Sequence, residues 1–143
     1  MTTITTPITR WFKEAVPTPM AKNFNVQLGV HVEEFGEMLD ALACDSDSFE
    51  QLKLLVKLVA LELKVGISQA TVINPQELLD ALCDQVVTAT GVAHMQGFMF
   101  DLALVEVNDS NWSKFVDGKA VFDGNGKIAK GPNYFRPKLG KYI

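Results

Sequence analysis

Acidic side chains recur at helical spacing in two segments of the sequence. The first segment, HVEEFGEMLDAL, places three carboxylates within about one helical turn and a fourth three residues further on: Glu33, Glu34, Glu37 and Asp40. The second segment, ELLDALCDQVV, carries its acids at i, i+3 and i+7, within an arc of roughly 60°: Glu77, Asp80 and Asp84. Such stripes are either ordinary solvated helix faces or the two halves of a cation site.

Neither acidic stripe has a basic residue on its own helix. The segments 24–43 and 75–97 contain no lysine or arginine, whereas segment 47–66 between them contains three lysines. Solvated faces usually mix charges, because like charges at i and i+4 repel by roughly 0.2–0.5 kcal/mol. Gathered carboxylates stay ionised only if positive charge lies between them, and a divalent cation supplies it. Oxygen ligands without paired His or Cys favour Mg²⁺ or Mn²⁺, and His31 and His94 stand isolated.

Charge is divided unevenly along the chain. Residues 1–107 hold fourteen acids and six bases, and residues 108–143 hold three acids and seven bases, within a net charge of -4. This balance argues against nucleic-acid binding, which usually needs a basic domain. Mg²⁺ held by a few carboxylates shares its coordination with water and substrate phosphates, so a phosphorylated ligand is expected. The basic tail is then either a phosphate-binding segment or a solubilising terminus.

The apolar periodicity predicts four helices that would position these groups. They cover residues 24–43, 47–66, 75–97 and about 98–107, with Gly66 as a C-cap and Asn74 with Pro75 at a helix start. After Asn108 the sequence turns to Gly, Asn, Asp and Lys, and FDGNGKI predicts a turn between short extended pieces. We expect one all-α domain over 1–143, a bundle of about four helices over 8–107 with an irregular or short-hairpin tail over 108–143.

Composition limits the compartment and the cysteine chemistry. The longest apolar stretch, LKLLVKLVALELKVG, is too short and too charged for a membrane span. The first residues lack a basic segment followed by an apolar one, so we expect a cytoplasmic protein. Cys44 and Cys83 are far apart, each directly after an apolar residue and in no CxxC arrangement, which predicts reduced and mostly buried thiols.

Two sets of motifs resemble a known family. EEFGE and ELLDALCDQVV are similar to the EExxE and ExxD motifs of the MazG-like all-α nucleoside triphosphate pyrophosphohydrolases. The tail, with SNWSK and GKIAKGPNY, resembles the SNxSK and GKxxKxxxY endings of the phosphoribosyl-ATP pyrophosphohydrolase-like branch, found often in phages and bacteria. The resemblance covers Trp11 to Leu139, with a longer gap than usual between the acidic motifs.

The resemblance implies cleavage between the α and β phosphates of a nucleoside triphosphate such as dUTP or dCTP. It implies Mg²⁺ ligands at Glu34 and Glu37, and Glu33 or Glu34 as the base that takes a proton from water. The predicted helix 75–97 contributes further Mg²⁺ ligands, either Glu77 with Asp80 or Asp80 with Asp84. The tail implies substrate contacts from Asn111, Lys114, Lys127, Lys130 and Tyr134.

The family also implies a homodimer or homotetramer in which a tail could complete a neighbour's site, in a host cytoplasm if the chain is phage-encoded. Two other functions stay open at this point. One is a non-catalytic, oligomeric nucleotide-binding or regulatory bundle. The other is hydrolysis of phosphoribosyl-ATP in histidine synthesis, whose own enzymes usually lack this SNxSK tail.

Overall fold

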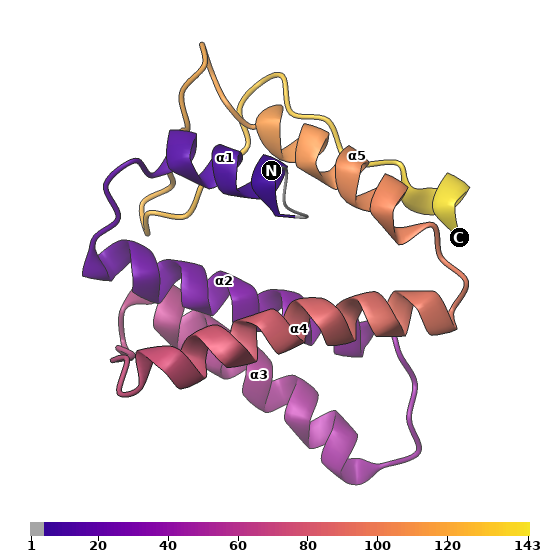
Figure 1. Cartoon of the computed structure of the whole chain (residues 1–143). Coiled ribbons are helices and arrows are strands. Elements are labelled where there is room, and N and C mark those ends of the chain that lie inside the picture. The colour runs from indigo at the N-terminus through magenta and orange to yellow at the C-terminus, as the bar shows by residue number, and fades with distance from the viewer. Residues whose placement is uncertain (1–4) are drawn as a thin grey trace. The chain divides into compact units, whose positions relative to one another are not determined.

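The computed structural model describes residues 5–143, and within that range it is all-α, with no β-strand. The elements are α1 Thr6–Ala15, α2 Ala21–Asp40, α3 Asp47–Val65, α4 Pro75–Met95, α5 Phe100–Trp112 and the 3₁₀-helix η1 Leu139–Tyr142 (Figure 1). The all-α class predicted from the sequence is confirmed. No helix in the described part of the chain is long and apolar enough to cross a bilayer.

The chain forms two compact units. The α2–α3 unit comprises residues 16–70 together with the loop 122–128. The α1–α4–α5 unit comprises the described part of residues 1–15 together with residues 71–121 and 129–143. The first acidic stripe therefore lies in the α2–α3 unit and the second in the α1–α4–α5 unit.

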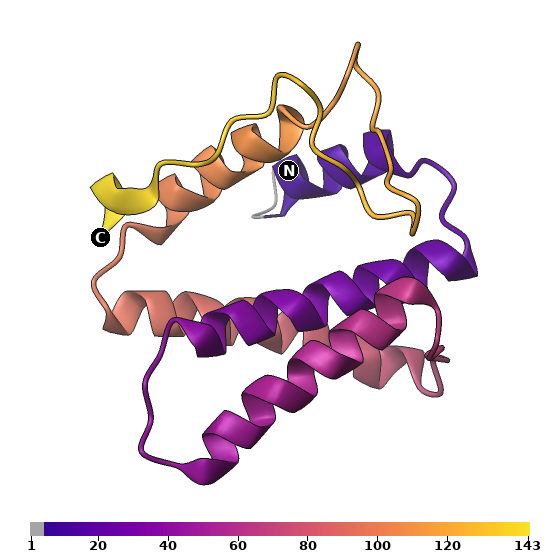
Figure 2. The ribbon, with the colours of Figure 1, turned by 180° about the vertical axis from the view of Figure 1, so that it is seen from behind.

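In the α2–α3 unit the two long helices pack against each other (Figure 2). Small residues of α2 form the seam between them. Gly29 and Gly36 of α2 are buried, and a Cβ added at Gly29 would lie 2.8 Å from Cγ of Lys64 and 2.9 Å from the carbonyl oxygen of Ala60. Gly36 faces Val56, at 3.1 Å from such a Cβ. The missing side chains let the two backbones approach closely.

Helix α3 ends where the sequence predicted. Gly66 is its C-cap in the left-handed conformation, with φ of 78°, and its N–H donates to the carbonyls of the last turn. The chain then turns back over α2, where the Asn25 amide binds it. Asn25 Nδ2 donates to the carbonyl oxygens of Leu63 and Ser68, and Oδ1 accepts from the N–H of Ala70.

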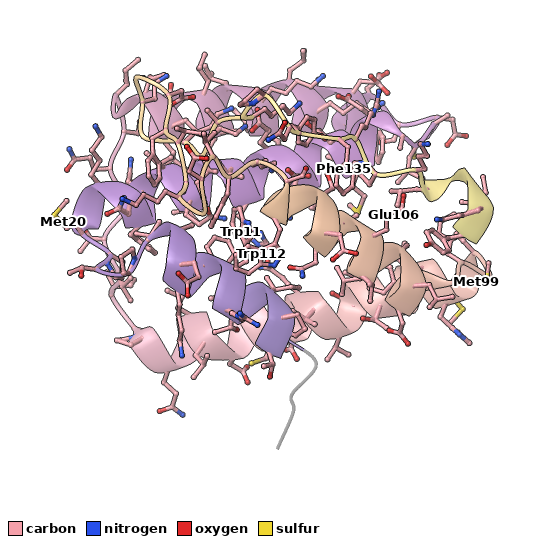
Figure 3. The ribbon with its side chains drawn as sticks, turned by 90° about the horizontal axis from the view of Figure 1, so that it is seen from above. Trp11, Met20, Met99, Glu106, Trp112 and Phe135 are labelled. Atoms are coloured by element: carbon pink, nitrogen blue, oxygen red, sulfur yellow. The ribbon has the colours of Figure 1, made fainter. Side chains whose placement is uncertain are left out.

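In the α1–α4–α5 unit an aromatic cluster joins α1 to the end of α5 (Figure 3). Trp11 is 6% exposed, and its ring lies 5.9 Å from that of Phe115, which in turn lies 5.2 Å from Trp112. Helix α4 begins at Pro75 after the Asn74 cap, whose side chain accepts from the N–H of Glu77, as the sequence predicted. Trp11 and Phe115 of this cluster are buried, together with Ala15 and Ala93 of the same unit.

The tail is irregular and is held along α5 by the serines of SNWSK. Ser110, 3% exposed, donates to the carbonyl oxygen of Phe135 at 2.8 Å, and Ser113 Oγ accepts from the N–H of Phe135. Isolated bridges join Val116 to Lys119 and, in the loop of the α2–α3 unit, Phe122 to Ile128. The predicted short hairpin is reduced to these bridges.

Several element boundaries differ from the prediction. Helix α1 and η1 were not predicted; Pro7 fits the first turn of α1, and Trp11 and Ala15, four apart, bury one face of it. Helix α5 runs to Trp112, past the expected end at 107, and in this added part the buried Ser110 donates a hydrogen bond to the Phe135 carbonyl of the tail. Asn111 therefore lies on a helix and not in the tail.

The apolar side chains of α2 and of the residues after it are unevenly covered. Phe24, Phe35 and Leu42 are 37%, 46% and 51% exposed, while the two glycines and Leu39 are buried. Cys44 and Cys83 are both exposed, so the prediction of buried thiols is wrong for this chain. Both cysteines follow apolar residues in sequence, but Cys44 lies in the loop between α2 and α3, and Cys83 lies on an exposed position of α4.

Candidate functional site

Glu33 lies on the edge of α2 that faces α3, in step with Gly29 and Gly36. It follows Gly29 by four residues and precedes Gly36 by three, so the three positions share a helix stripe. Its carboxylate meets two cations: Oε1 lies 2.5 Å from Nζ of Lys64, and Oε2 lies 2.8 Å from Nζ of Lys127. We call Glu33, Lys64 and Lys127 the Glu33 ion cluster.

The Glu33 ion cluster is partly shielded from water. The Glu33 side chain is 28% exposed, and those of Lys64 and Lys127 are 17% and 40% exposed. Burial by itself raises the pKa of Glu33, but hydrogen bonds from Lys127 and Lys64 and the charges of these lysines outweigh it, so the pKa lies below its ordinary value. Glu33 is therefore a weak proton acceptor and a firm anchor for two ammonium groups.

The other acids of α2 differ from Glu33 in their surroundings. Glu34 and Glu37 are exposed and three residues apart, so they are neighbours on the helix surface. Asp40 lies 2.8 Å from Nζ of Lys57 on α3. Lysines from α3 and from the loop thus supply the positive charge at Glu33 and Asp40. The expectation of a helix without a basic residue is wrong, because α2 begins at Ala21 and includes Lys22 in its first turn.

The acids of the second stripe lie on exposed positions of α4. Glu77 is in the first turn, where its N–H is bound by Asn74, and Asp80 and Asp84 follow it along the helix. These three acids belong to the α1–α4–α5 unit, whereas Glu34 and Glu37 belong to the α2–α3 unit. Among residues 5–143, no three His, Cys, Asp or Glu side chains are grouped closely enough to hold a metal ion.

The predicted substrate-binding residues are also divided between the units. Lys127 is in the α2–α3 unit; the other four, Asn111, Lys114, Lys130 and Tyr134, are in the α1–α4–α5 unit. Lys130 Nζ lies 4.7 Å from the centre of the Tyr134 ring, and Lys114 Nζ lies 5.9 Å from that of Trp11. The backbone there is tightly held, since Gly131 N–H donates to the Lys114 carbonyl.

Comparison with known proteins adds no relative. No protein-family model, no curated protein and no solved structure matches the chain. The case for a function therefore depends on the residues and their geometry.

Sequence reasoning missed two contributors to the α2–α3 unit. Lys64 was noted as one of three lysines between the acidic segments, yet its spacing did not reveal that it faces Glu33. Asn25 resembles any polar residue of an amphipathic helix, although it is 8% exposed and makes three hydrogen bonds. Asn25 lies between Phe24 and Val26, and a polar residue among apolar ones could have indicated a buried, hydrogen-bonded side chain.

Proposed function

We propose that this protein is a Mg²⁺-dependent nucleoside triphosphate pyrophosphohydrolase, which releases a nucleoside monophosphate and pyrophosphate. The ion pair between Lys127 and Glu33 carries the proposal, because it brings a cation of the basic tail to the EExxE turn of α2. Carboxylates for a metal and ammonium groups for phosphates are the two requirements of phosphoryl transfer. Both are present in the α2–α3 unit.

Glu34 and Glu37 fit the donor set that Mg²⁺ uses. This ion usually takes one or two protein carboxylates and completes its octahedron with water and substrate phosphates. Glu33 does not fit as a ligand, because each of its oxygens accepts a hydrogen bond from a lysine. When bound, Mg²⁺ would neutralise phosphate charge and lower the pKa of a coordinated water.

The protein's own groups have distinct parts in the proposed reaction. Lys64 and Lys127, held in place by Glu33, present positive charge to the phosphates. Glu33 is a poor base, since its pKa is lowered and both of its oxygens are engaged, so the proposed base is Glu34, which would then bind Mg²⁺ through no more than one of its two oxygens. Glu77, Asp80 and Asp84 on α4 stay candidates for further ligands.

Exposed apolar side chains support the proposed homodimer or homotetramer. On α3, Leu54, Leu58 and Leu61 are 72%, 51% and 52% exposed, and on α4, Leu79 and Val87 are 64% and 67% exposed. Apolar residues gathered on helix faces mark association surfaces. Light scattering coupled to gel filtration should give a multiple of 15.8 kDa, and a monomer would contradict this part of the proposal.

Pyrophosphate release from dUTP, dCTP, dATP, dGTP and dTTP tests the enzyme directly. We expect Mg²⁺-dependent release from at least one of them, and a loss of about 100-fold or more in Glu34→Gln and Glu37→Gln, since even residues behind a metal ligand are worth 10–100-fold. Glu14→Gln, on an exposed position of α1, is the matched control. Absence of release from every triphosphate would overturn the proposal.

A further inference from the structure

The α2–α3 unit contains an open cavity of about 450 Å³. Its walls come from the start of α2, the end of α3, the following segment to Ala70, and Gly124 and Asn125 of the loop. Its volume is in the range of small-molecule sites, which is roughly 300–1,000 Å³. All of its lining residues belong to this one unit.

One wall of this cavity is held in place before any ligand arrives. Asn25 Nδ2 donates to the Leu63 carbonyl at 2.7 Å and to the Ser68 carbonyl at 2.9 Å, while Oδ1 accepts from the N–H of Ala70 at 2.9 Å. These bonds fix the segment that carries Gln69 against α2. A preformed wall reduces the entropy lost when a ligand binds.

Three polar side chains at the cavity are not used by the fold. Within residues 5–143, Lys22, Gln69 and Asn125 make no side-chain hydrogen bond or ion pair, in contrast to Lys64 on the same wall, which binds Glu33. The Lys22 side chain lies over the loop, with Cε 3.6 Å from the position of a Cβ on Gly126. Phe24 adds an aromatic ring that is 37% exposed.

We infer that this cavity is the nucleoside subsite, in which Gln69 and Asn125 hydrogen-bond the edge of the base and Phe24 stacks on its face. A primary amide offers both donors and an acceptor, which suits a base edge, whereas an inorganic anion needs donors alone. Aromatic stacking accepts any base, so the amides would give the preference among bases. Lys22 would face the phosphate. The inference rests on the proposed function, because it names where that enzyme binds its substrate.

The test uses the whole ¹⁵N-labelled protein in EDTA, without Mg²⁺, so that binding is observed without turnover. The probes are dUMP, dCMP, dAMP, dGMP and inorganic phosphate, each at about 10 mM, which fills most sites even for a Kd of about 1 mM. We expect at least one nucleotide to shift the side-chain amide signals of Gln69 and Asn125, and phosphate to leave them in place. Gln69→Ala and Asn125→Ala should each raise the Kd for that nucleotide about fivefold, which corresponds to the loss of one neutral hydrogen bond.

Two substitutions serve as matched controls. Gln51→Ala and Asn133→Ala remove an exposed amide of the same kind outside the cavity and should bind the nucleotide like the wild type. The inference is overturned if no nucleotide shifts the two amides, if phosphate alone shifts them equally, or if both cavity variants bind like the wild type.

Pyrophosphate release separates this inference from the proposed function. If Gln69→Ala and Asn125→Ala hydrolyse triphosphates with unchanged KM and base preference, the subsite is wrong and the hydrolase stands. If the nucleotides bind as expected but no triphosphate yields pyrophosphate, the hydrolase is wrong and the cavity is still a nucleotide site.

Discussion

Nζ of Lys127 lies 2.8 Å from Oε2 of Glu33, although the two residues are 94 positions apart in the chain. The other oxygen of the same carboxylate accepts a hydrogen bond from Lys64 on α3. One side chain of α2 therefore joins α3 and the 122–128 loop. This relationship gives the first prediction.

Replacing Glu33 with Gln should lower the free energy of unfolding by about 1 kcal/mol. Two lysines lose their shared counter-charge, but water reaches the 28% exposed carboxylate and screens the loss. Urea unfolding of the wild type and variant measures the difference. Asp40→Asn is the control; its pair with Lys57 is more exposed, at 42% and 55%, and should cost less than about 0.5 kcal/mol. Equal losses would contradict the special position of Glu33.

The contribution of Glu33 should also depend on pH. Because its pKa is lowered in the folded protein from an ordinary 4.5, the stabilisation is complete above that value and is lost as the pH falls below it. The difference between wild type and Glu33→Gln should therefore shrink on acidification from pH 7 to below about 4.5. A constant difference across this range would show that the ion cluster does not form.

Gly29→Ala should destabilise the protein by about 1–3 kcal/mol, as overpacking does. The new methyl group would meet the backbone carbonyl of Ala60 at 2.9 Å, and that atom cannot move without shifting α3. Gly91→Ala is the control: it also lies within a helix, but nothing stands within 4 Å of its added Cβ. It should stabilise by about 0.5–1 kcal/mol through helix propensity. Thermal unfolding measures both changes. Changes of the same sign would contradict the close approach of α2 and α3 at Gly29.

Ser110→Ala should loosen the tail. The variant removes the donor to the Phe135 carbonyl from a residue that is 3% exposed, and the loss should be about 1–2 kcal/mol. Hydrogen exchange should quicken at the Phe135 amide and its neighbours while α2 and α3 keep their protection. Ser48→Ala, on an exposed position of α3, should leave the tail as it is. An unchanged exchange rate at the Phe135 amide in Ser110→Ala would show that Ser110 does not hold the tail.

The C-terminal 3₁₀-helix should detach in acid. Hydrogen bonds from Lys141, the Lys138 N–H and Tyr142 hold the pKa of Glu106 at about 2, against an ordinary 4.5. A depressed carboxyl pKa gives stabilisation that is present above 4.5 and is lost as the pH falls toward 2. NMR signals of the Tyr142 ring should move toward those of an unstructured tyrosine over this range. Glu106→Gln should move them already at pH 7, and identical titrations of both proteins would contradict the contact.

Mg²⁺ should raise the melting temperature of the wild-type protein. A ligand that binds only the folded state must stabilise it, by about 2.7 kcal/mol at a hundred times its Kd. Glu37→Gln should remove this shift and Glu14→Gln should keep it, as followed by differential scanning fluorimetry. A full Mg²⁺ shift in both Glu34→Gln and Glu37→Gln would place the metal elsewhere.

Much of the helical framework could be predicted because its signals are local. Asn74 with Pro75 and the left-handed Gly66 define helix ends through bonds to residues a few positions away. Helix α1 was missed because its evidence is a single apolar face, Trp11 and Ala15, in a Thr- and Pro-rich segment.

The partners of the acidic residues could not be predicted in this way. The absence of lysine from segment 24–43 suggested that its carboxylates lack positive charge, yet Lys57, Lys64 and Lys127 reach two of them from other segments. The face through which α2 packs against α3 could not be predicted either, because glycines do not count as apolar residues in a periodicity pattern. Their small size, however, is what lets α3 approach.

The sequence by itself determined the all-α class, the helix ends at Gly66 and Pro75, and the two acidic stripes, because hydrophobic period and capping act between residues within a few positions of one another. Only the tertiary structure decided that Glu33 faces Lys64 and Lys127, that Asn25 fixes one wall of a cavity, and that Phe24 remains exposed beside it. Those relationships depend on how closely two helix backbones approach, and that distance is set at Gly29 and Gly36, where side chains are missing.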